Sequence, residues 1–173
     1  MVFSHDTRPP DALRYRRIPA TVLEISRQDH SQVSARAADD PVQLALDEAR
    51  EVVGDLAGAP EVLAEVLPGL CRIALEAALH EVVMRRVFGP GTPSWKTMKI
   101  EESLGKGGKL VQLASLALFG ERRASSLIHA ELTQRLGAET SHVISWCNRD
   151  SHTAVDVSDP LARIDRTARV ARG

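Results

Sequence analysis

The sequence predicts an all-α helical bundle that follows a short irregular or β-hairpin amino-terminal segment. From residue 40 onward, helix-starting and helix-ending residues alternate at short intervals, and the apolar residues between them recur at helical spacing. Apolar residues also make up 43% of the 173 positions, which is enough for one core in a chain of this length. We therefore expect two parts: an amino-terminal arm over residues 1–40 and a helical bundle over residues 41–173.

The amino-terminal arm is predicted from weak local signals. Residues 1–19 contain three prolines and scattered charges without periodicity, so we expect a mobile segment. Residues 21–25 are enriched in β-branched side chains, and residues 32–35 can pair with them across a polar turn at residues 28–31. The arm is therefore expected to contain at most one hairpin.

The first bundle helix is expected to begin at Pro41. Asp40 has the side chain of an N-cap, and proline suits the first helical position because its missing N–H is not needed there. An apolar stripe follows until Gly54 and Gly58 end the helix. These local signals define the start of the bundle.

Residues 60–88 form the most apolar stretch of the chain. Pro68 lies within it and removes one amide donor, so we predict a break or kink near residues 66–67 and two helical pieces. The piece from Pro68 onward has apolar residues on nearly every side. This pattern is typical of the central helix of a bundle.

The remaining helices are predicted from glycine, proline and capping residues. Residues 89–94 end the central helix, and Ser94 is expected to cap a short helix that stops at Gly105. Asp159 and Pro160 are expected to start the final helix. The expected ranges are residues 95–104, 109–119, 122–136, 140–147 and 160–171.

Composition limits the partners and the compartment. The net charge of −1 gives no general attraction to nucleic acid or to a membrane, so such a partner must be met locally. The longest uncharged run, residues 110–120, is far shorter than the roughly 20 residues of a membrane helix, and no apolar signal core is present at the amino terminus. We therefore expect a cytoplasmic protein without a membrane partner, and the two distant cysteines suit a reducing compartment.

Cofactor and metal motifs are not found. The glycine- and lysine-rich residues 105–109 do not have the G-x-x-x-x-G-K-[ST] spacing of a phosphate loop, and no strand is predicted before them. The six histidines and two cysteines show no zinc-binding spacing. We therefore interpret residues 105–109 as a helix connection and expect no cofactor and no metal.

Two polar patterns on helices have a functional and a structural interpretation. Arg72, Glu76 and His80 are four residues apart, so they could form a buried triad, although a charged row along one packed helix is favoured. The final helix exposes an arginine every three residues, which could bind RNA phosphates or form an ordinary solvated face. The arginines of this stripe are Arg163, Arg166, Arg169 and Arg172.

The remaining motif is W-C-N-R-D-S-H at residues 146–152, between two predicted helices. With a long helix that opens C-R-I-A-L-E-A-A-L at residues 71–79, a loop, a helical hairpin and a closing helix, it resembles the HEPN (higher eukaryote and prokaryote nucleotide-binding) superfamily. The likeness covers about residues 68–171 and is closest to bacterial members with C-R-x-A-L-E and G-N-x-x-x-H patterns. It implies a small helical bundle that forms a homodimer.

The resemblance also implies a metal-independent endoribonuclease with an R-x4-6-H motif. In such enzymes the histidine manages proton transfer as the RNA 2′-hydroxyl attacks the phosphate, and the arginine stabilises the developing charge. By position, His152 matches the acid/base and Asn148 the residue that orients it, whereas Cys147 stands at the position of the arginine. Losing one such stabiliser typically costs about 10²- to 10³-fold in rate, and Arg149 is the nearest phosphate contact that remains.

Two alternatives to this site stay open. Asn148 can instead cap a helix end, while His152 packs beneath the final helix and bonds a carbonyl. A second formal R-x5-H match, Arg123 to His129, falls inside a predicted helix and arises easily by chance. The motif therefore allows both an active-site role and a fold-stabilising role.

A second resemblance concerns residues 22–40. They are similar to the stretch that joins a nucleotide-binding core to a helical carboxyl-terminal domain in some bacterial ATPases of phage-defence or toxin-type modules. We therefore expect an RNA-directed module of such a system, with a ribonuclease activity that Cys147 puts in question. The alternative is a non-catalytic dimerisation or adaptor domain that binds a partner ATPase, toxin or antitoxin.

Overall fold

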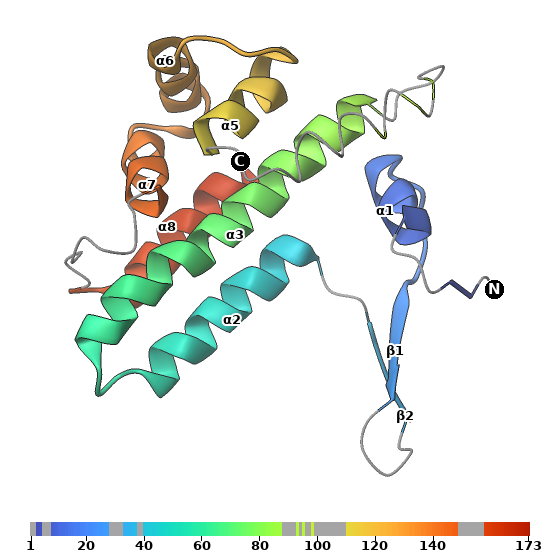
Figure 1. The fold of residues 1–173 in the computed structure, drawn as a ribbon, viewed down its shortest axis with the longest axis horizontal. Helices are drawn as coiled ribbons and strands as arrows, with labels where there is room; N and C mark the ends of the chain where they lie inside the picture. Colours follow the sequence, from blue (N-terminus) through green and yellow to red (C-terminus); the bar gives the residue numbers. More distant parts are fainter. Residues whose placement is uncertain are drawn as a thin grey trace.

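The helices pack around one long central helix, and a hairpin extends to one side (Figure 1). This computed structural model describes residues 3–4, 8–27, 33–37, 40–87, 93, 95, 98, 110–148 and 158–173. The elements are α1 (Arg8–Tyr15), β1 (Leu23–Arg27), β2 (Val33–Ala37), α2 (Pro41–Asp55), α3 (Pro60–Val87), α5 (Leu110–Phe119), α6 (Ser125–Leu136), α7 (Glu139–Cys147) and α8 (Pro160–Arg172). The predicted all-α bundle is confirmed, and none of these described helices is both long and apolar enough to cross a membrane.

The predicted hairpin is present. Strands β1 and β2 pair antiparallel with Ile25 opposite Ala35. Strand β1 begins two residues later than predicted, and β2 begins one residue later. Leu23, Ile25 and Val33 are all more than half exposed. The hairpin therefore buries little apolar surface against the described part of the bundle (Figure 1).

Helix α1 corrects the expectation that residues 1–19 form a mobile segment. Tyr15 is buried against α3, with its hydroxyl 3.3 Å from Nδ1 of His80. Arg14 lies over the Tyr15 ring and pairs with Asp11 at 2.9 Å. Because this docking joins residues 65 positions apart, the local pattern could not reveal it.

Helix α2 starts as predicted. The Asp40 carboxylate accepts the backbone N–H of Val42 at 2.9 Å, and Pro41 occupies the first helical position. Leu46 and Ala49 are fully buried in the core cluster, whereas Leu44 is about half exposed. The helix therefore has one face in the core and another on the surface.

Helix α3 is continuous through Pro68, so the predicted division into two helical pieces is wrong. Proline cannot donate to the carbonyl of Ala64, which weakens this turn. However, Pro68 is buried beside fully buried Leu67 and Cys71, so the apolar packing on both sides of the proline holds the turn together. The prediction that this is the central helix is confirmed, since α3 packs against α1, α2, α5, α7 and α8.

The carboxyl-terminal helices follow the predicted order. Helices α5, α7 and α8 start within one residue of the predicted positions, and Asp159 caps α8 by accepting the N–H of Ala162 at 3.0 Å. Helix α6 begins three residues later than predicted, because the Ser115 hydroxyl bonds the Glu121 carbonyl and the Arg123 N–H and so holds a turn there. The predicted segments at residues 95–104 and 105–109 and the cap at Ser94 lie outside the described residues, apart from Trp95 and Met98.

Candidate functional site

The carboxyl end of α7 carries the predicted Asn148. This residue is the C-cap: its backbone N–H donates to the carbonyl of Ile144 at 3.0 Å, and the residue is half-buried. Asn148 therefore ends α7, as the capping alternative predicted. Arg149 and His152 lie outside the described residues.

Cys147 lies inside the core. It is 2% exposed and is grouped with fully buried Cys71 of α3, while Thr167 of α8 is also fully buried and donates its hydroxyl to the Arg163 carbonyl at 2.9 Å. Burial, together with the neighbouring Cys71, raises the pKa of the Cys147 thiol, and burial raises the pKa of Cys71 to about 11. Both thiols are therefore protonated near neutral pH and serve neither as nucleophiles nor as metal ligands.

Both cysteines are expected to resist thiol reagents in the folded protein. A pKa near 11 instead of 9.0 leaves Cys71 about 100-fold less thiolate at neutral pH, and burial slows access further. Stopped-flow labelling with a disulfide reagent should show no fast thiol in buffer and two in urea. The pKa of Cys71 is higher in the folded state, so the unfolded chain loses this proton first as pH rises. The contribution of protonated Cys71 to the free energy of unfolding is therefore full below pH 9.0 and is lost as pH rises through about 11. A fast thiol in the native protein would contradict the burial of this pair.

Two arginines from other helices lie near this helix end. Arg72 of α3 and Arg163 of α8 are both close enough to Cys147 for their positive charges to lower its pKa, although burial outweighs them. The Arg163 guanidinium lies 5.3 Å from the centre of the Trp146 ring, and Arg72 pairs with Glu76 at 2.7 Å. Two positive charges, from α3 and α8, therefore lie within electrostatic range of residue 147, which is itself uncharged.

Trp146 adds an unsatisfied donor to the same region. Its ring is 4% exposed, and Nε1 has no hydrogen-bond partner among the described residues. A buried donor without an acceptor typically costs about 1–3 kcal/mol. An acceptor at the Trp146 indole would therefore be stabilising.

Three of the four arginines of α8, Arg166, Arg169 and Arg172, are exposed as predicted, whereas Arg163 is not. Three residues correspond to 300° of helical rotation, so successive arginines move around the helix. Arg163 is half-buried against Trp146, and Arg169 pairs with Glu139 of α7 at 3.2 Å. Arg172 bonds Gln43 of α2, and exposed Arg166 makes no ion pair with another described residue. Arg163 and Arg169 therefore contact α7, and Arg172 contacts α2, which the three-residue spacing alone did not indicate.

The ladder on α3 is a charged row and not a triad. Arg72 pairs with Glu76, as expected for side chains four residues apart. His80 faces the amino-terminal arm, where it contacts Tyr15 through both a hydrogen bond and a tilted ring contact. This supports the structural interpretation favoured by the sequence.

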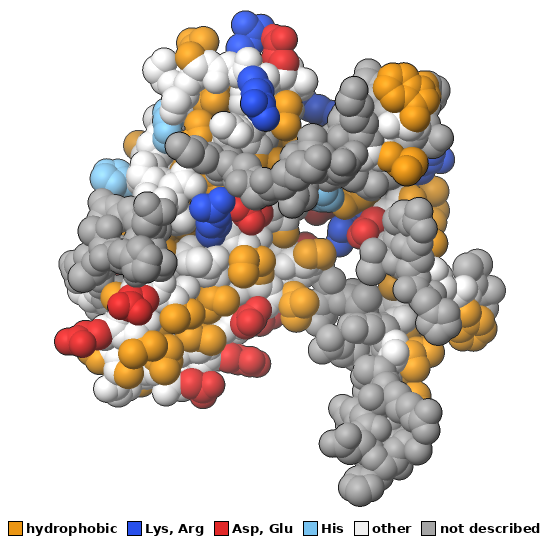
Figure 2. Space-filling model, viewed as in Figure 1, with side chains coloured by type: hydrophobic (Ala, Val, Ile, Leu, Met, Phe, Trp, Pro, Cys, Tyr) orange, Lys and Arg blue, Asp and Glu red, His pale blue; other side chains and the backbone are white. Residues whose placement is uncertain are grey.

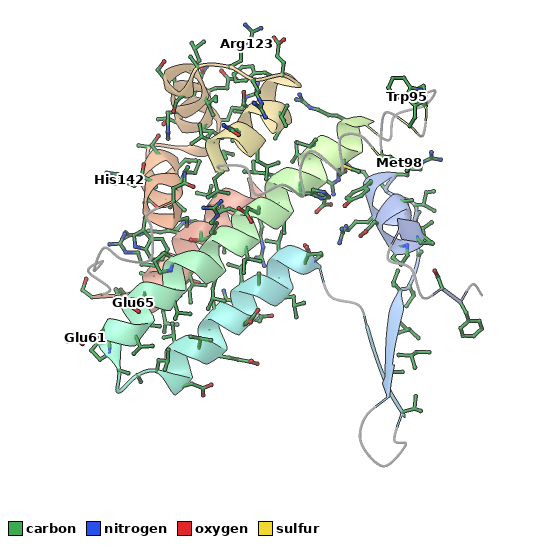
Figure 3. The ribbon with its side chains drawn as sticks, viewed as in Figure 1. Glu61, Glu65, Trp95, Met98, Arg123 and His142 are labelled. Carbon is green, nitrogen blue, oxygen red and sulfur yellow. The ribbon has the colours of Figure 1, made fainter. Side chains whose placement is uncertain are left out.

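The second R-x5-H match is not brought together. Arg123 precedes α6, pairs with Glu121 and lies at the outer tip of the α5–α6 connection (Figure 3), whereas His129 lies within α6. His129 contacts the Ser141 hydroxyl at 3.3 Å and joins α6 to α7. The expectation that both residues belong to one helix is wrong, and His129 has a packing role.

No family model matches the chain, and neither the curated proteins nor the solved structures include a match to it. Within the described ranges, no three histidine, cysteine, aspartate or glutamate side chains are placed to hold a metal ion. The candidate site therefore consists of Arg72, Trp146, Asn148 and Arg163. The sequence singled out three of these residues in separate patterns, but only the packing of α3, α7 and α8 brings them together.

Proposed function

We propose that this chain is a HEPN-like, RNA-directed module of a bacterial defence or toxin-type system, and that it contacts RNA at the carboxyl end of α7. The observation that carries this proposal is that Arg72 and Arg163, from two different helices, both lie within electrostatic range of Cys147, the residue before Asn148, and that Arg163 lies over the Trp146 ring. Guanidinium groups bind phosphate well because they present several N–H donors in a plane. In the sequence, Arg149 directly follows Asn148, and His152 comes three residues after Arg149.

The proposed chemistry is cleavage of RNA without a metal. His152 accepts the proton of a 2′-hydroxyl as its oxygen attacks the adjacent phosphorus, and protonated His152 then donates this proton to the departing 5′-oxygen, which leaves a 2′,3′-cyclic phosphate and a 5′-hydroxyl. Asn148 orients His152. Arg163 and Arg72 stabilise the charge on the phosphoryl oxygens, a role that buried Cys147 cannot take.

The test is cleavage of a labelled mixed-sequence RNA in excess EDTA. We expect wild-type cleavage, loss of activity in His152→Ala and a fall of about 10²-fold in Arg163→Ala, because one phosphate-facing charge is removed. Arg122→Ala is the matched control, since Arg122 is exposed on the α5–α6 connection. Unfolding curves of each variant exclude loss of structure as the cause. Cleavage that needs a divalent metal, or that survives His152→Ala, would refute the ribonuclease proposal.

The HEPN resemblance also leads us to propose a cytoplasmic homodimer. Sedimentation velocity of the purified chain measures the oligomeric state directly. A monomer at all concentrations would remove dimerisation from the proposal without affecting the RNA test.

A second candidate function is a non-catalytic adaptor, and a specific surface favours it. The α2–α3 surface consists of exposed apolar side chains between acidic ones, and Figure 2 shows orange hydrophobic groups flanked by red acidic groups over these helices. The exposed apolar side chains of α2 and α3 include Leu44, Val62, Val66 and Ile73, and the exposed acidic side chains of the same helices include Glu48, Glu51, Glu61 and Glu65. An apolar strip with acidic edges fits a basic amphipathic helix of a partner protein.

The adaptor candidate is tested with a synthetic helix of leucine and lysine. Wild-type protein should bind it, more weakly at high salt because the charges are on the surface. Glu61→Lys combined with Glu65→Lys should weaken binding strongly, because both carboxylates lie at the same end of α3 (Figure 3). Glu121→Lys combined with Glu139→Lys, at two exposed positions on the α5–α6 connection and on α7, is the charge-matched control. Equal weakening by both changes would show a general charge effect and would contradict a defined docking surface.

A further inference from the structure

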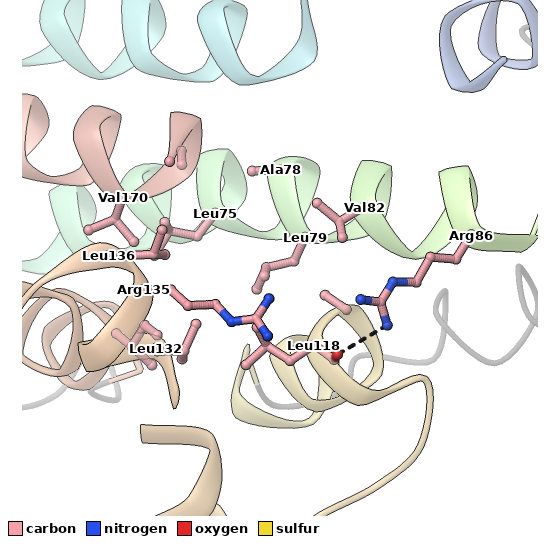
Figure 4. A pocket seen from close by; sticks show the side chains of 14 residues that line it. Leu75, Ala78, Leu79, Val82, Arg86, Leu118, Leu132, Arg135, Leu136 and Val170 are labelled. Carbon is pink, nitrogen blue, oxygen red and sulfur yellow. Dashed lines mark hydrogen bonds between the residues drawn. The ribbon is translucent and has the colours of Figure 1, made fainter. Parts of the chain in front are cut away.

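A pocket of about 250 Å³ lies on the side of α3 opposite α2, between α3, α5, α6 and the end of α8 (Figure 4). Its walls are largely aliphatic: Leu75, Leu79 and Val82 from α3, Leu132 and Leu136 from α6, and Val170 from α8. The α7-end site contributes no side chain to it. The pocket is therefore a separate feature of the bundle.

The size and lining of the pocket suit a small apolar group. An engineered cavity of about 150 Å³ holds benzene, and pockets for drug-sized ligands measure about 300–1,000 Å³. The pocket lies between these limits. It is therefore large enough for a body of about six to eight carbons.

Two arginines supply the polar part of the pocket. Arg86 of α3 donates one N–H to the Leu118 carbonyl at 3.1 Å, and Arg135 of α6 pairs through Nε with Glu131 at 2.6 Å. Figure 4 shows both guanidinium groups beside Leu79 and Leu118 within the pocket. A guanidinium has five N–H donors, so each group keeps donors beyond these contacts with described residues.

The charge at the pocket selects an anion. Among the side chains that line the pocket, Arg86 and Arg135 carry positive charges and Glu131 offsets one of the two, which leaves one positive side-chain charge beside an aliphatic cavity. A single carboxylate matches this charge and accepts hydrogen bonds from two guanidinium groups in their plane. An ammonium group would be repelled there.

We propose that this pocket binds a small aliphatic carboxylate, with its hydrocarbon body among the leucines and its carboxylate on Arg86 and Arg135. The apolar body contributes most of the binding free energy through burial, and the two arginines fix its orientation. This inference does not depend on the RNA proposal, because the two sites share no residue.

The experiment is a calorimetric titration of the full chain with sodium octanoate, compared with octylammonium chloride of the same chain length. We expect saturable octanoate binding and a dissociation constant at least about tenfold higher for octylammonium. Arg86→Gln should weaken octanoate binding about tenfold. Arg85→Gln should leave this binding unchanged, because Arg85 is the preceding residue of α3 and lies outside the pocket lining.

A pair of valine variants tests the position of the ligand. Val82 and Val66 are both 40% exposed on α3, but only Val82 lines the pocket. Val82→Phe should abolish octanoate binding by filling the cavity, and Val66→Phe should leave it unchanged. Equal affinity for octanoate and octylammonium, unchanged binding in Val82→Phe, or no saturable octanoate binding by wild type would each overturn the proposal. The RNA cleavage assay is unaffected by any of these outcomes.

Discussion

Cys147→Arg should destabilise the protein by about 4 kcal/mol or more and should not raise the rate of RNA cleavage above that of wild type. The substitution introduces the arginine that the HEPN motif places at this position, but residue 147 is 2% exposed in the core beside Cys71. A buried charge without a partner costs about 3–5 kcal/mol, and the larger side chain adds about 1–3 kcal/mol of overpacking. Arg72 and Arg163 are close by and would repel it.

Urea unfolding of Cys147→Arg measures this effect, and Cys147→Ala is the matched control. The alanine variant removes one small side chain, so we expect a loss of only about 0.5–2 kcal/mol. If Cys147→Arg folded with wild-type stability and cleaved RNA in EDTA faster than wild type, then residue 147 would face the solvent, and the core described around it would be wrong. Loss of stability in the arginine variant alone would confirm that residue 147 is buried and does not accept a charged side chain.

The burial of Cys147 was present in the sequence as a pattern. Val143, Ile144 and Cys147 are spaced so that they fall on one side of α7, and all three are buried. The motif at residues 146–152 and this stripe overlap at Cys147, and only the stripe predicts that Cys147 is buried. The convergence of Arg72 and Arg163 had no such signal, because it depends on how three separate helices pack.

Local chemistry explains which helix ends could be predicted. Asp40 and Asp159 both cap helices as expected, because an aspartate that accepts a nearby N–H depends only on its own neighbours. Helix α1 was missed because Tyr15 and His80 stabilise it from 65 residues apart. Pro68 was misjudged for a related reason: the cost of one lost hydrogen bond is local, but the packing of α3 against five other helices is not.

Leu46→Ala should lower the free energy of unfolding by about 3 kcal/mol, whereas Leu44→Ala should change it by less than about 0.5 kcal/mol. Both leucines lie on α2 and lose the same atoms, so helix propensity and transfer chemistry are matched. Leu46 is fully buried in the core cluster, where its removal leaves a cavity, but Leu44 is 48% exposed on the α2–α3 surface. For a chain of this size, the Leu46 change corresponds to a fall in Tm of about 6–12 °C.

The same pair of variants separates stability from recognition. If the α2–α3 surface binds an amphipathic helix, Leu44→Ala should weaken binding of the leucine–lysine helix without changing stability. The reason is that exposed Leu44 loses its contact with water only when a partner covers it. Leu46→Ala should destabilise the protein and affect binding only through the unfolded fraction. A Leu44→Ala variant that bound the helix as well as wild type would show that this surface is ordinary solvated exterior, and the adaptor candidate would lose the observation that favours it.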